Sequence, residues 1–163
     1  SDATISNKTI VGIMDSFAVN IYKDMLLSIK QGKSVCGKSK AKPYFLLSMI
    51  ECIALGKQTV NKIRWDNSEL IKTYDSIFRY YKDEHFVPLL VPYFHLSSSS
   101  FYHLVCKEGI TPQKHNRTPS QSFLRANLLY AKLDDELWGL LQTAGNREFF
   151  KRCIINRFIK ENK

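Results

Sequence analysis

The sequence lacks the patterns that mark membrane-spanning and secreted proteins. It has no run of about 18 apolar residues, so we expect no transmembrane span. It opens on no signal-peptide pattern, and its four cysteines are scattered without a C-x-x-C pair. A disulfide framework is not expected in a chain of 163 residues, which is long enough to bury its own core. These absences predict a cytoplasmic location in a reducing compartment, with no membrane partner.

Acidic residues are scarce as well. The chain carries 24 Lys and Arg against 15 Asp and Glu, which gives a formal net charge of +9. This excess favours polyanionic partners, nucleic acid first and an anionic membrane surface second, although a solvated basic surface without a specific partner would have the same charge. The hydrophobic content of 44% predicts a folded globule rather than a disordered chain.

Patterns of catalytic residues are absent. A metal-dependent nuclease needs clustered carboxylates or a His-Asn-His arrangement that holds a cation and activates water. The adjacent acids Asp134, Asp135 and Glu136 instead fall at a predicted helix start, where they complement the helix dipole. The segment Lys114-His115-Asn116 has no third member at a useful spacing, and no Ser or Cys nucleophile stands in a strand–turn–helix setting. We therefore expect no catalytic residue in this chain.

Residues that can bind zinc surround one region, but their spacing does not favour a metal site. His103 and Cys106 are separated as H-x-x-C, and His95 and His115 lie further away. Structural zinc sites generally combine two closely spaced pairs, and the sequence contains one. We predict neither a metal nor another cofactor.

Helical periodicity extends over most of the chain. Apolar residues recur at three- and four-residue steps, which predicts helices at residues 9–31, 43–55, 68–82, 121–131 and 146–161, and a shorter one that begins near Leu133. The helix at 43–55 is apolar on most sides, so we expect it at the centre of the core. Asp66 or Asn67, and Ser120, are suitable N-caps, and Gly56 is a suitable stop.

The segment from Pro92 to Val105 departs from this helical pattern. Pro88 and Pro92 favour an extended entry, and the residues from Phe101 to Val105 alternate as in a half-buried strand. The four serines before Phe101 match a common hairpin loop length, so we predict a β-hairpin at about residues 93–105. The predicted fold class is mainly α (α+β): a single compact helical domain over residues 1–163 with one small antiparallel β-hairpin.

Basic residues gather in two irregular segments. No acid occurs between Asp24 and Glu51, and this interval contains Gly37 and the lysines 30, 33, 38, 40 and 42. It is interpreted either as a mobile basic loop or as a clamp on DNA phosphates, in which Gly37 lets the main chain come close. The second segment, residues 107–120, has one acid and includes Lys114 and Arg117.

DNA recognition requires phosphate contacts that position the protein and polar side chains that read base edges. The basic segments can supply the first, and the predicted hairpin can supply the second if it enters a groove. Alternatively, the hairpin faces solvent and its aromatic residues pack on the core. The candidate DNA-binding residues are Gly37, Lys38, Ser39, Lys40, His95, Ser98, Ser99, Tyr102, His103, Lys114 and Arg117.

Four segments occur in an order that is typical of one known family. They are Cys36-Gly37-Lys38-Ser39-Lys40, Lys42-Pro43-Tyr44-Phe45-Leu46-Leu47, Pro92-Tyr93-Phe94-His95-Leu96 with Phe101-Tyr102-His103-Leu104, and Ala131-Lys132-Leu133-Asp134-Asp135-Glu136-Leu137. In this order the sequence resembles, over about residues 36–160, the sulfur-recognising DNA-binding domain that accompanies HNH nuclease domains in modification-dependent restriction endonucleases.

The resemblance implies a mainly helical domain that binds duplex DNA carrying a phosphorothioate linkage. Its DNA-contacting regions would fall on Gly37, Lys38, Ser39 and Lys40 for the backbone, and near His95, Tyr102 and His103 for the bases. Its small apolar sulfur cavity, built around an aromatic–proline pair, would fall on Leu133, Asp134 and Leu137. An apolar pocket favours sulfur because sulfur is larger and less well hydrated than a phosphate oxygen.

Two departures from the family pattern bear on selectivity. Lysines stand where arginines are typical, which removes bidentate phosphate contacts. Leu133-Asp134 replaces the aromatic–proline pair, and Asp134 would repel a backbone phosphate that it faced. DNA binding is therefore expected to be retained better than sulfur selectivity, and the target could equally be another modification or unmodified DNA.

The sequence starts without a methionine, so we expect a fragment of a larger protein, an HNH restriction endonuclease whose missing domains could form homo-oligomers. The expected partner is double-stranded DNA. The alternative is a non-catalytic protein-interaction or regulatory helical domain whose basic loops are merely solvated. Affinity for duplex DNA that falls steeply with salt would distinguish the two.

Overall fold

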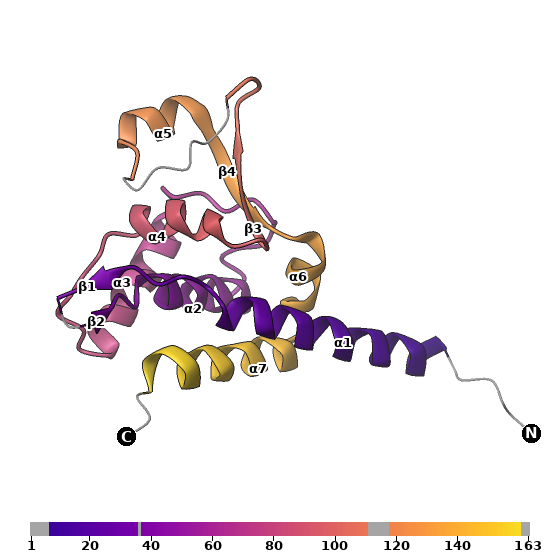
Figure 1. Cartoon of the computed structure of the whole chain (residues 1–163). Coiled ribbons are helices and arrows are strands. Elements are labelled where there is room, and N and C mark those ends of the chain that lie inside the picture. Colours follow the sequence, from indigo (N-terminus) through magenta and orange to yellow (C-terminus); the bar gives the residue numbers. More distant parts are fainter. Residues whose placement is uncertain (1–6, 36, 111–117, 161–163) are drawn as a thin grey trace, which may run out of the picture.

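The helix α2 (Ala41–Ala54) runs through the centre of the computed structural model, which describes residues 7–35, 37–110 and 118–160 (Figure 1). Eleven of its fourteen residues are buried, as its apolar sides predict. The hydroxyl of Ser48 lies in this core and donates a 2.6 Å hydrogen bond to the carbonyl of Tyr44. Gly56 follows the helix with φ +70°, a left-handed conformation that glycine adopts without strain.

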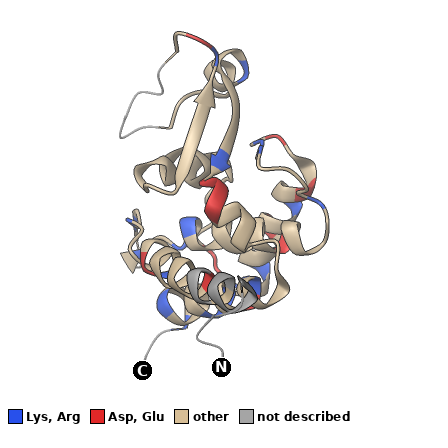
Figure 2. Cartoon of the chain, turned by 90° about the vertical axis from the view of Figure 1, so that its right-hand side faces the viewer, with Lys and Arg blue, Asp and Glu red and all other residues tan. Residues whose placement is uncertain are grey.

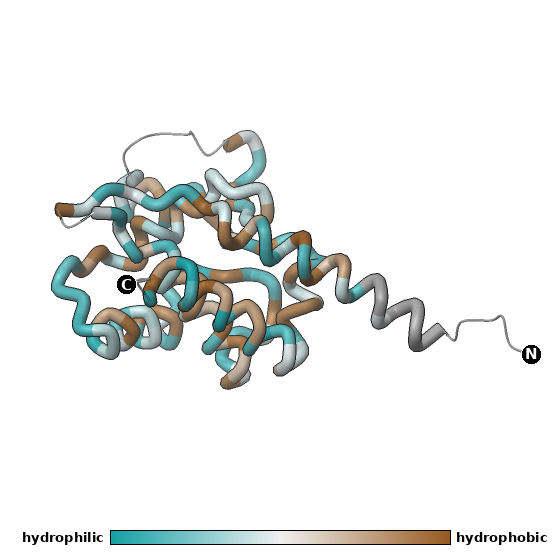
Figure 3. The backbone as a smooth tube through the Cα atoms, turned by 60° about the horizontal axis from the view of Figure 1, so that its bottom comes forward, coloured by the Kyte–Doolittle hydropathy of each residue, from teal (hydrophilic) through white to brown (hydrophobic). Residues whose placement is uncertain are grey.

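Three other predicted helices assemble around α2. They are α1 (Asn7–Leu27), α3 (Ser68–Tyr80) and α7 (Ala144–Ile154), which continues into the π-helical turn η2 (Ile155–Ile159). α3 and α7 contact α2, and α1 contacts α7. Figure 3 shows hydrophobic and hydrophilic segments alternating along the described part of α1. This helix buries Tyr22 and Leu26, whereas Phe17 and Ile21 of the predicted apolar stripe are exposed. Asn67 caps α3 as predicted, because its side chain accepts hydrogen bonds from the amides of Glu69 and Leu70.

Residues 90–98 are helical, so the hairpin predicted at residues 93–105 is wrong in its first strand. α4 (Leu90–His95) is followed by the 3₁₀ turn η1 (Leu96–Ser98). Pro92 lies in the first turn of α4, where a missing N–H removes no intrahelical hydrogen bond. Tyr93 and Phe94 are 0% and 5% exposed, and a strand with one solvent-facing side could not bury two consecutive residues.

The antiparallel hairpin forms instead between β3 (Tyr102–Cys106) and β4 (Leu128–Leu133). The main chain of Ala131 in β4 also exchanges two hydrogen bonds with that of Ile63, at 2.7 and 2.8 Å. α5 (Gln121–Asn127), capped by Ser120, therefore ends before the predicted limit of residue 131. Pairing with β3 and Ile63 outweighs the local helical periodicity of this segment.

The fold class is confirmed as mainly α with a small antiparallel hairpin. A second, two-residue pairing joins β1 (Lys33–Ser34) to β2 (Gly37–Lys38), and α6 (Asp135–Leu140) follows β4. Figure 1 shows the β3–β4 hairpin and α5 projecting from the helical body, with β1 and β2 at its left and α6 at its right. Within the described ranges, no helix combines the length and the apolar character needed to cross a bilayer.

Candidate nucleic-acid interface

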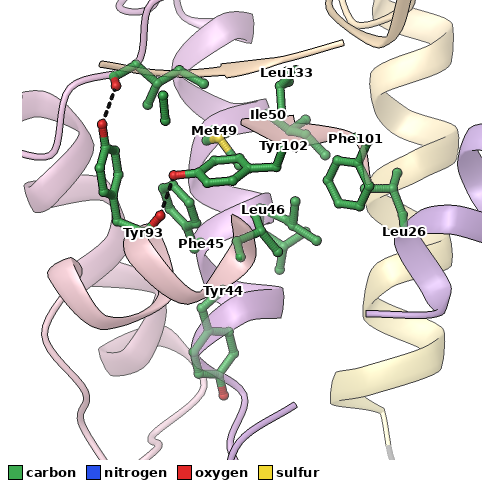
Figure 4. Close-up of a cluster of buried hydrophobic side chains, with 14 of the residues drawn as sticks. Leu26, Tyr44, Phe45, Leu46, Met49, Ile50, Tyr93, Phe101, Tyr102 and Leu133 are labelled. Atoms are coloured by element: carbon green, nitrogen blue, oxygen red, sulfur yellow. Dashed lines mark hydrogen bonds between the residues drawn. The ribbon is translucent and has the colours of Figure 1, made fainter. Parts of the chain in front are cut away.

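Three residues assigned to DNA recognition lie in the core instead. Tyr102, Leu133 and Leu137 are each 1% exposed. Figure 4 shows the ring of Tyr102 directed into the core, where its hydroxyl donates a hydrogen bond to the carbonyl oxygen of Tyr93. Tyr102 therefore cannot read base edges, and the two leucines cannot line an open sulfur pocket, so these assignments are wrong.

The third residue assigned to the sulfur pocket, Asp134, has both carboxylate oxygens occupied. Its Oδ1 lies 2.6 Å from His103 Nε2, and its Oδ2 accepts a 2.9 Å hydrogen bond from the hydroxyl of Tyr22. Burial, followed by this hydrogen bond, raises the pKa of Tyr22, which therefore stays a donor. Figure 2 looks onto α6 and shows its acidic start among scattered basic segments, so charges of both signs are interspersed on this side.

A groove at the start of α2 brings together most of the basic interval between Asp24 and Glu51. We call it the Lys42 groove; its volume is about 480 Å³. The main chain after α1, the first turn of α2 and the helix α4 form its walls. Its lining residues are Lys30, Gln31, Gly32, Lys33, Ser39, Ala41, Lys42, Val87, Val91, Pro92, His95 and Ser98.

Lys42 holds the walls of this groove together. Its ammonium donates to the carbonyl oxygen of Lys30 at 2.6 Å and to Ser98 Oγ at 3.4 Å. Burial, helped by the nearby charge of Lys30, lowers the pKa of Lys42. A lysine ammonium has three N–H donors, so one remains for a ligand, and a bound anion would compensate for the water that burial removes.

The positive end of α2 opens into the same groove. Lys40 is the N-cap residue and offers no capping oxygen, although Ser39 Oγ accepts from the amide of Ala41 at 3.2 Å. The first turn of α2 contains no acid, and Lys42 lies in it. The helix dipole and Lys42 therefore add the same sign of charge in the groove, which stabilises a bound anion.

His95 lines the opposite wall of the groove. Its Nε2 lies 3.0 Å from Thr118 Oγ1. Burial, with the charge of Lys42 as a smaller cause, lowers the pKa of His95 below its usual value of 6.5. The imidazole is therefore neutral at neutral pH, and it can act as a donor at one nitrogen and an acceptor at the other.

A short loop places the remaining lysines beside the groove. Gln31 Nε2 donates to the carbonyl of Ser39 at 3.0 Å, and the amide of Ser39 donates to the carbonyl of Gly32 at 2.7 Å. The β1–β2 pairing closes this loop, and Gly37 adopts φ +116° in it, which favours glycine. Lys38 in β2 is thereby held in an exposed position beside this loop.

Two neighbouring depressions continue the groove. The serine hollow, about 430 Å³, shares Lys30 and Ser98 with it and also contains Ser99. A cavity of about 580 Å³, which we call the Lys82 cavity, shares Gln31 and Ser39 with the groove. It is lined by Gln31, Ser34, Lys38, Ser39, Lys40, Tyr44, Tyr81, Lys82, Asp83, Glu84, His85, Arg157, Phe158 and Ile159.

Apart from the core residues Tyr102, Leu133 and Leu137, the predicted site residues divide into three sets. Those that the three adjoining depressions bring together are Lys38, Ser39, Lys40, His95, Ser98 and Ser99. Gly37, His103 and Asp134 line none of the three, and His103 is paired with Asp134. Lys114 and Arg117 lie outside the described residues. Lys42, Lys82 and Arg157 also line these depressions and were not among the predicted site residues; for Lys42, the run of lysines was the available signal.

The described residues contain no group of three or more His, Cys, Asp or Glu side chains placed to hold a metal ion. The chemistry of the interface is therefore that of lysine ammonium groups, hydroxyls, one imidazole and a helix N-terminus. These groups bind anions, and none of them is arranged as a nucleophile with a base.

The architecture defines a mainly helical domain with a buried central helix, a projecting hairpin and a cationic groove. Solved structures share this fold. The sulfur-binding domain of ScoMcrA complexed with phosphorothioated DNA superimposes with a TM-score of 0.60 at 16% identity, covering 84% of this chain and 86% of that chain. The sulfur-binding and SRA domains of ScoMcrA, also complexed with phosphorothioated DNA, give a TM-score of 0.65 at 15% identity and cover 85% of this chain.

This likeness confirms the resemblance to a sulfur-binding domain at the level of the fold. The chain spans 42% of the length of the ScoMcrA chain that contains both domains. No family model matches the sequence, and no curated protein matches it.

Proposed function

We propose that this chain is a DNA-recognition module that binds the backbone of duplex DNA in the Lys42 groove. The observation that carries the proposal is the positive end of α2, which opens into the groove with Lys42 and without an acid in its first turn. Both ScoMcrA structures of the same fold are complexes with phosphorothioated DNA, which supports DNA as the ligand. The net charge of +9 agrees with a polyanionic partner.

The walls of the groove suit a backbone linkage that carries sulfur. Lys42 and His95 offer polar atoms on one part of the groove, whereas Val87, Val91 and Pro92 make another part apolar. A non-bridging sulfur loses less hydration than an oxygen when it contacts apolar side chains, while the second non-bridging oxygen keeps a charged donor. The proposed sulfur site is therefore this groove, in place of the buried Leu133 and Leu137.

The proposed biological setting is the recognition part of a modification-dependent restriction endonuclease, with the nuclease on a separate domain. The arrangement of cations without a catalytic constellation in the groove supports a binding role for this part. The two-domain ScoMcrA chain, which joins its sulfur-binding domain to an SRA domain, is an example of such a module beside another domain.

The test compares two duplexes of identical sequence, one plain and one with a single central phosphorothioate, by fluorescence anisotropy over a salt series. We expect both to bind at low salt, with log affinity falling linearly with log salt at a slope of about −0.9 per neutralised phosphate. The modified duplex should bind more tightly. Equal affinities would restrict the function to unmodified backbone binding, and no binding of either duplex at low salt would refute the proposal.

A further inference from the structure

Lys82 has a backbone conformation that lysine rarely adopts. Its φ is +53°, and among the described residues it is the one non-glycine with positive φ. It follows the end of α3, where its amide donates to the carbonyl of Arg79 at 3.1 Å and the amide of Asp83 donates to that of Phe78 at 3.0 Å. This pair of hydrogen bonds ends a helix with a left-handed residue, and glycine is the residue that fits there without strain.

The strained position places Lys82 in a cationic cavity. The Lys82 cavity also receives Lys38 from β2, Lys40 from the N-cap of α2 and Arg157 from the turn η2. Three segments that are far apart in sequence therefore place these four cations around one space of about 580 Å³. Within residues 7–35, 37–110 and 118–160, none of these four cations lies within 4.0 Å of a carboxylate oxygen.

Two acids, Asp83 and Glu84, also line the cavity, and both carboxylate oxygens of Asp83 already accept hydrogen bonds. Asp83 Oδ2 accepts a 2.9 Å hydrogen bond from the hydroxyl of Tyr44, and its Oδ1 accepts one of 2.9 Å from the amide of His85. The ring of Tyr81 stacks on that of Tyr44, with centroids 5.7 Å apart. Asp83 thus orders the loop that carries Lys82, and the cations still outnumber the two carboxylates.

We propose that the Lys82 cavity is a second phosphate-binding site for the same DNA strand, and that Lys82 is retained in its strained conformation for this contact. The inference rests on the proposed function of the Lys42 groove. The two depressions share Gln31 and Ser39, so a strand that lies in the groove continues over the cavity. Successive phosphates of one strand advance about 3.4 Å along the duplex axis, so a neighbouring phosphate is always available.

The contact is to the backbone and carries no sequence preference. Lys82 and Arg157 approach the phosphate from α3 and η2, whereas Lys38 and Lys40 approach it from the loop before α2. The C-terminal turn of the chain is therefore part of the DNA-binding surface, which extends beyond the linkage in the groove.

The test is the substitution Lys82→Gly in the full chain, with melting temperature and DNA affinity measured on the same preparation. Glycine relieves the left-handed strain, so the melting temperature should rise, while the lost phosphate contact should lower affinity about eightfold at about 0.1 M salt. The salt slope should become shallower by about 0.9. Arg157→Gln should weaken binding and flatten the slope in the same way without the gain in melting temperature.

The matched control is Lys72→Gly, which removes an exposed lysine from the interior of α3, outside all three depressions. It should lower the melting temperature and leave affinity and slope unchanged. If Lys82→Gly leaves affinity and slope at the wild-type values while Lys42→Ala weakens binding, the second phosphate site is refuted and the proposed function stands. A fall in melting temperature for Lys82→Gly would refute the strained-lysine argument. Absence of DNA binding by the wild-type chain would refute both proposals.

Discussion

Two regions of this molecule place charged side chains at the start of a helix, and the surroundings of these charges differ. At the start of α6, the carboxylate of Asp134 contacts His103 and Tyr22, and these contacts join α1 and β3 to α6. At the start of α2, Lys42 donates to a carbonyl oxygen and a hydroxyl, and it pairs with no carboxylate among the described residues. Net charge alone therefore does not distinguish the two regions, whereas the pairing of each charge does, and the proposed DNA-binding surface is the region where lysine has no carboxylate partner among the described residues.

Replacing one lysine in each region, Lys42 or Lys132, should give the largest difference in DNA affinity. Lys42→Ala removes a desolvated ammonium from the groove, and we expect DNA affinity to fall by between about tenfold and a hundredfold. Lys132→Ala removes a lysine from β4, opposite His103, and should change affinity by less than about twofold. Anisotropy titrations of both variants, with circular dichroism to verify folding, make the comparison. A larger loss of affinity for Lys132→Ala than for Lys42→Ala would indicate that DNA binds at the hairpin instead.

A substitution in the core should affect stability and leave binding unchanged. Tyr102→Phe removes the hydroxyl that donates to the carbonyl of Tyr93, in a site that is 1% exposed. A buried acceptor without a donor costs about 1–3 kcal/mol of unfolding free energy. Urea denaturation should show this loss, and the affinity of the folded protein for DNA should equal that of the wild type. Weaker DNA binding by the fully folded variant would indicate that the Tyr102 hydroxyl contributes to DNA binding after all.

The smallest expected effect is that of pH on the groove. The pKa of His95 is lower in the folded protein than in the unfolded chain, so the unfolded chain binds more protons as the pH falls below about 6.5. Acidification from about pH 8 to about pH 6 should therefore reduce stability slightly. A protonated His95 also adds positive charge to the groove, so DNA affinity should rise by up to a few fold over the same range.

His95→Gln is the control for this pH effect, because it keeps a polar side chain that cannot take up a proton near neutral pH. The variant should lose both the acid-induced loss of stability and the acid-induced gain in affinity. An unchanged pH profile in His95→Gln would show that another group titrates, and an affinity that falls on acidification of the wild type would contradict the sign of the argument.

Particular elements show how far sequence reasoning extended. The periodicity of α1, α2, α3 and α7 and the caps Asn67 and Ser120 were predicted within a few residues, because helices depend on contacts three and four residues apart. The strand β4 was missed, because Leu128–Leu133 becomes extended only by pairing with β3 and Ile63. The alternation at Phe101–Val105 correctly predicted a strand. Tyr102 was wrongly expected to be accessible to DNA, because both faces of the chain are buried where β3 begins.

The candidate site was predictable only where it depends on residues close together in the sequence. The lysine-rich interval without acids was visible in the sequence, and so were the serines before Phe101. That Lys42 reaches Ser98, 56 positions away, could not be read from either segment alone. The assignment of a sulfur pocket to Leu133 and Leu137 failed because local pattern gives no information on which apolar residues the rest of the fold covers.

By itself, the amino-acid sequence determined the long helices of this protein, the caps of α3 and α5 and its excess of positive charge, because these depend on neighbouring residues and on composition. Only the tertiary structure decided which lysines share a surface, which aromatic residues are buried and where the hairpin forms. Grooves and strand pairs are made by residues that are distant along the chain, and their geometry exists only after the helices have packed around α2.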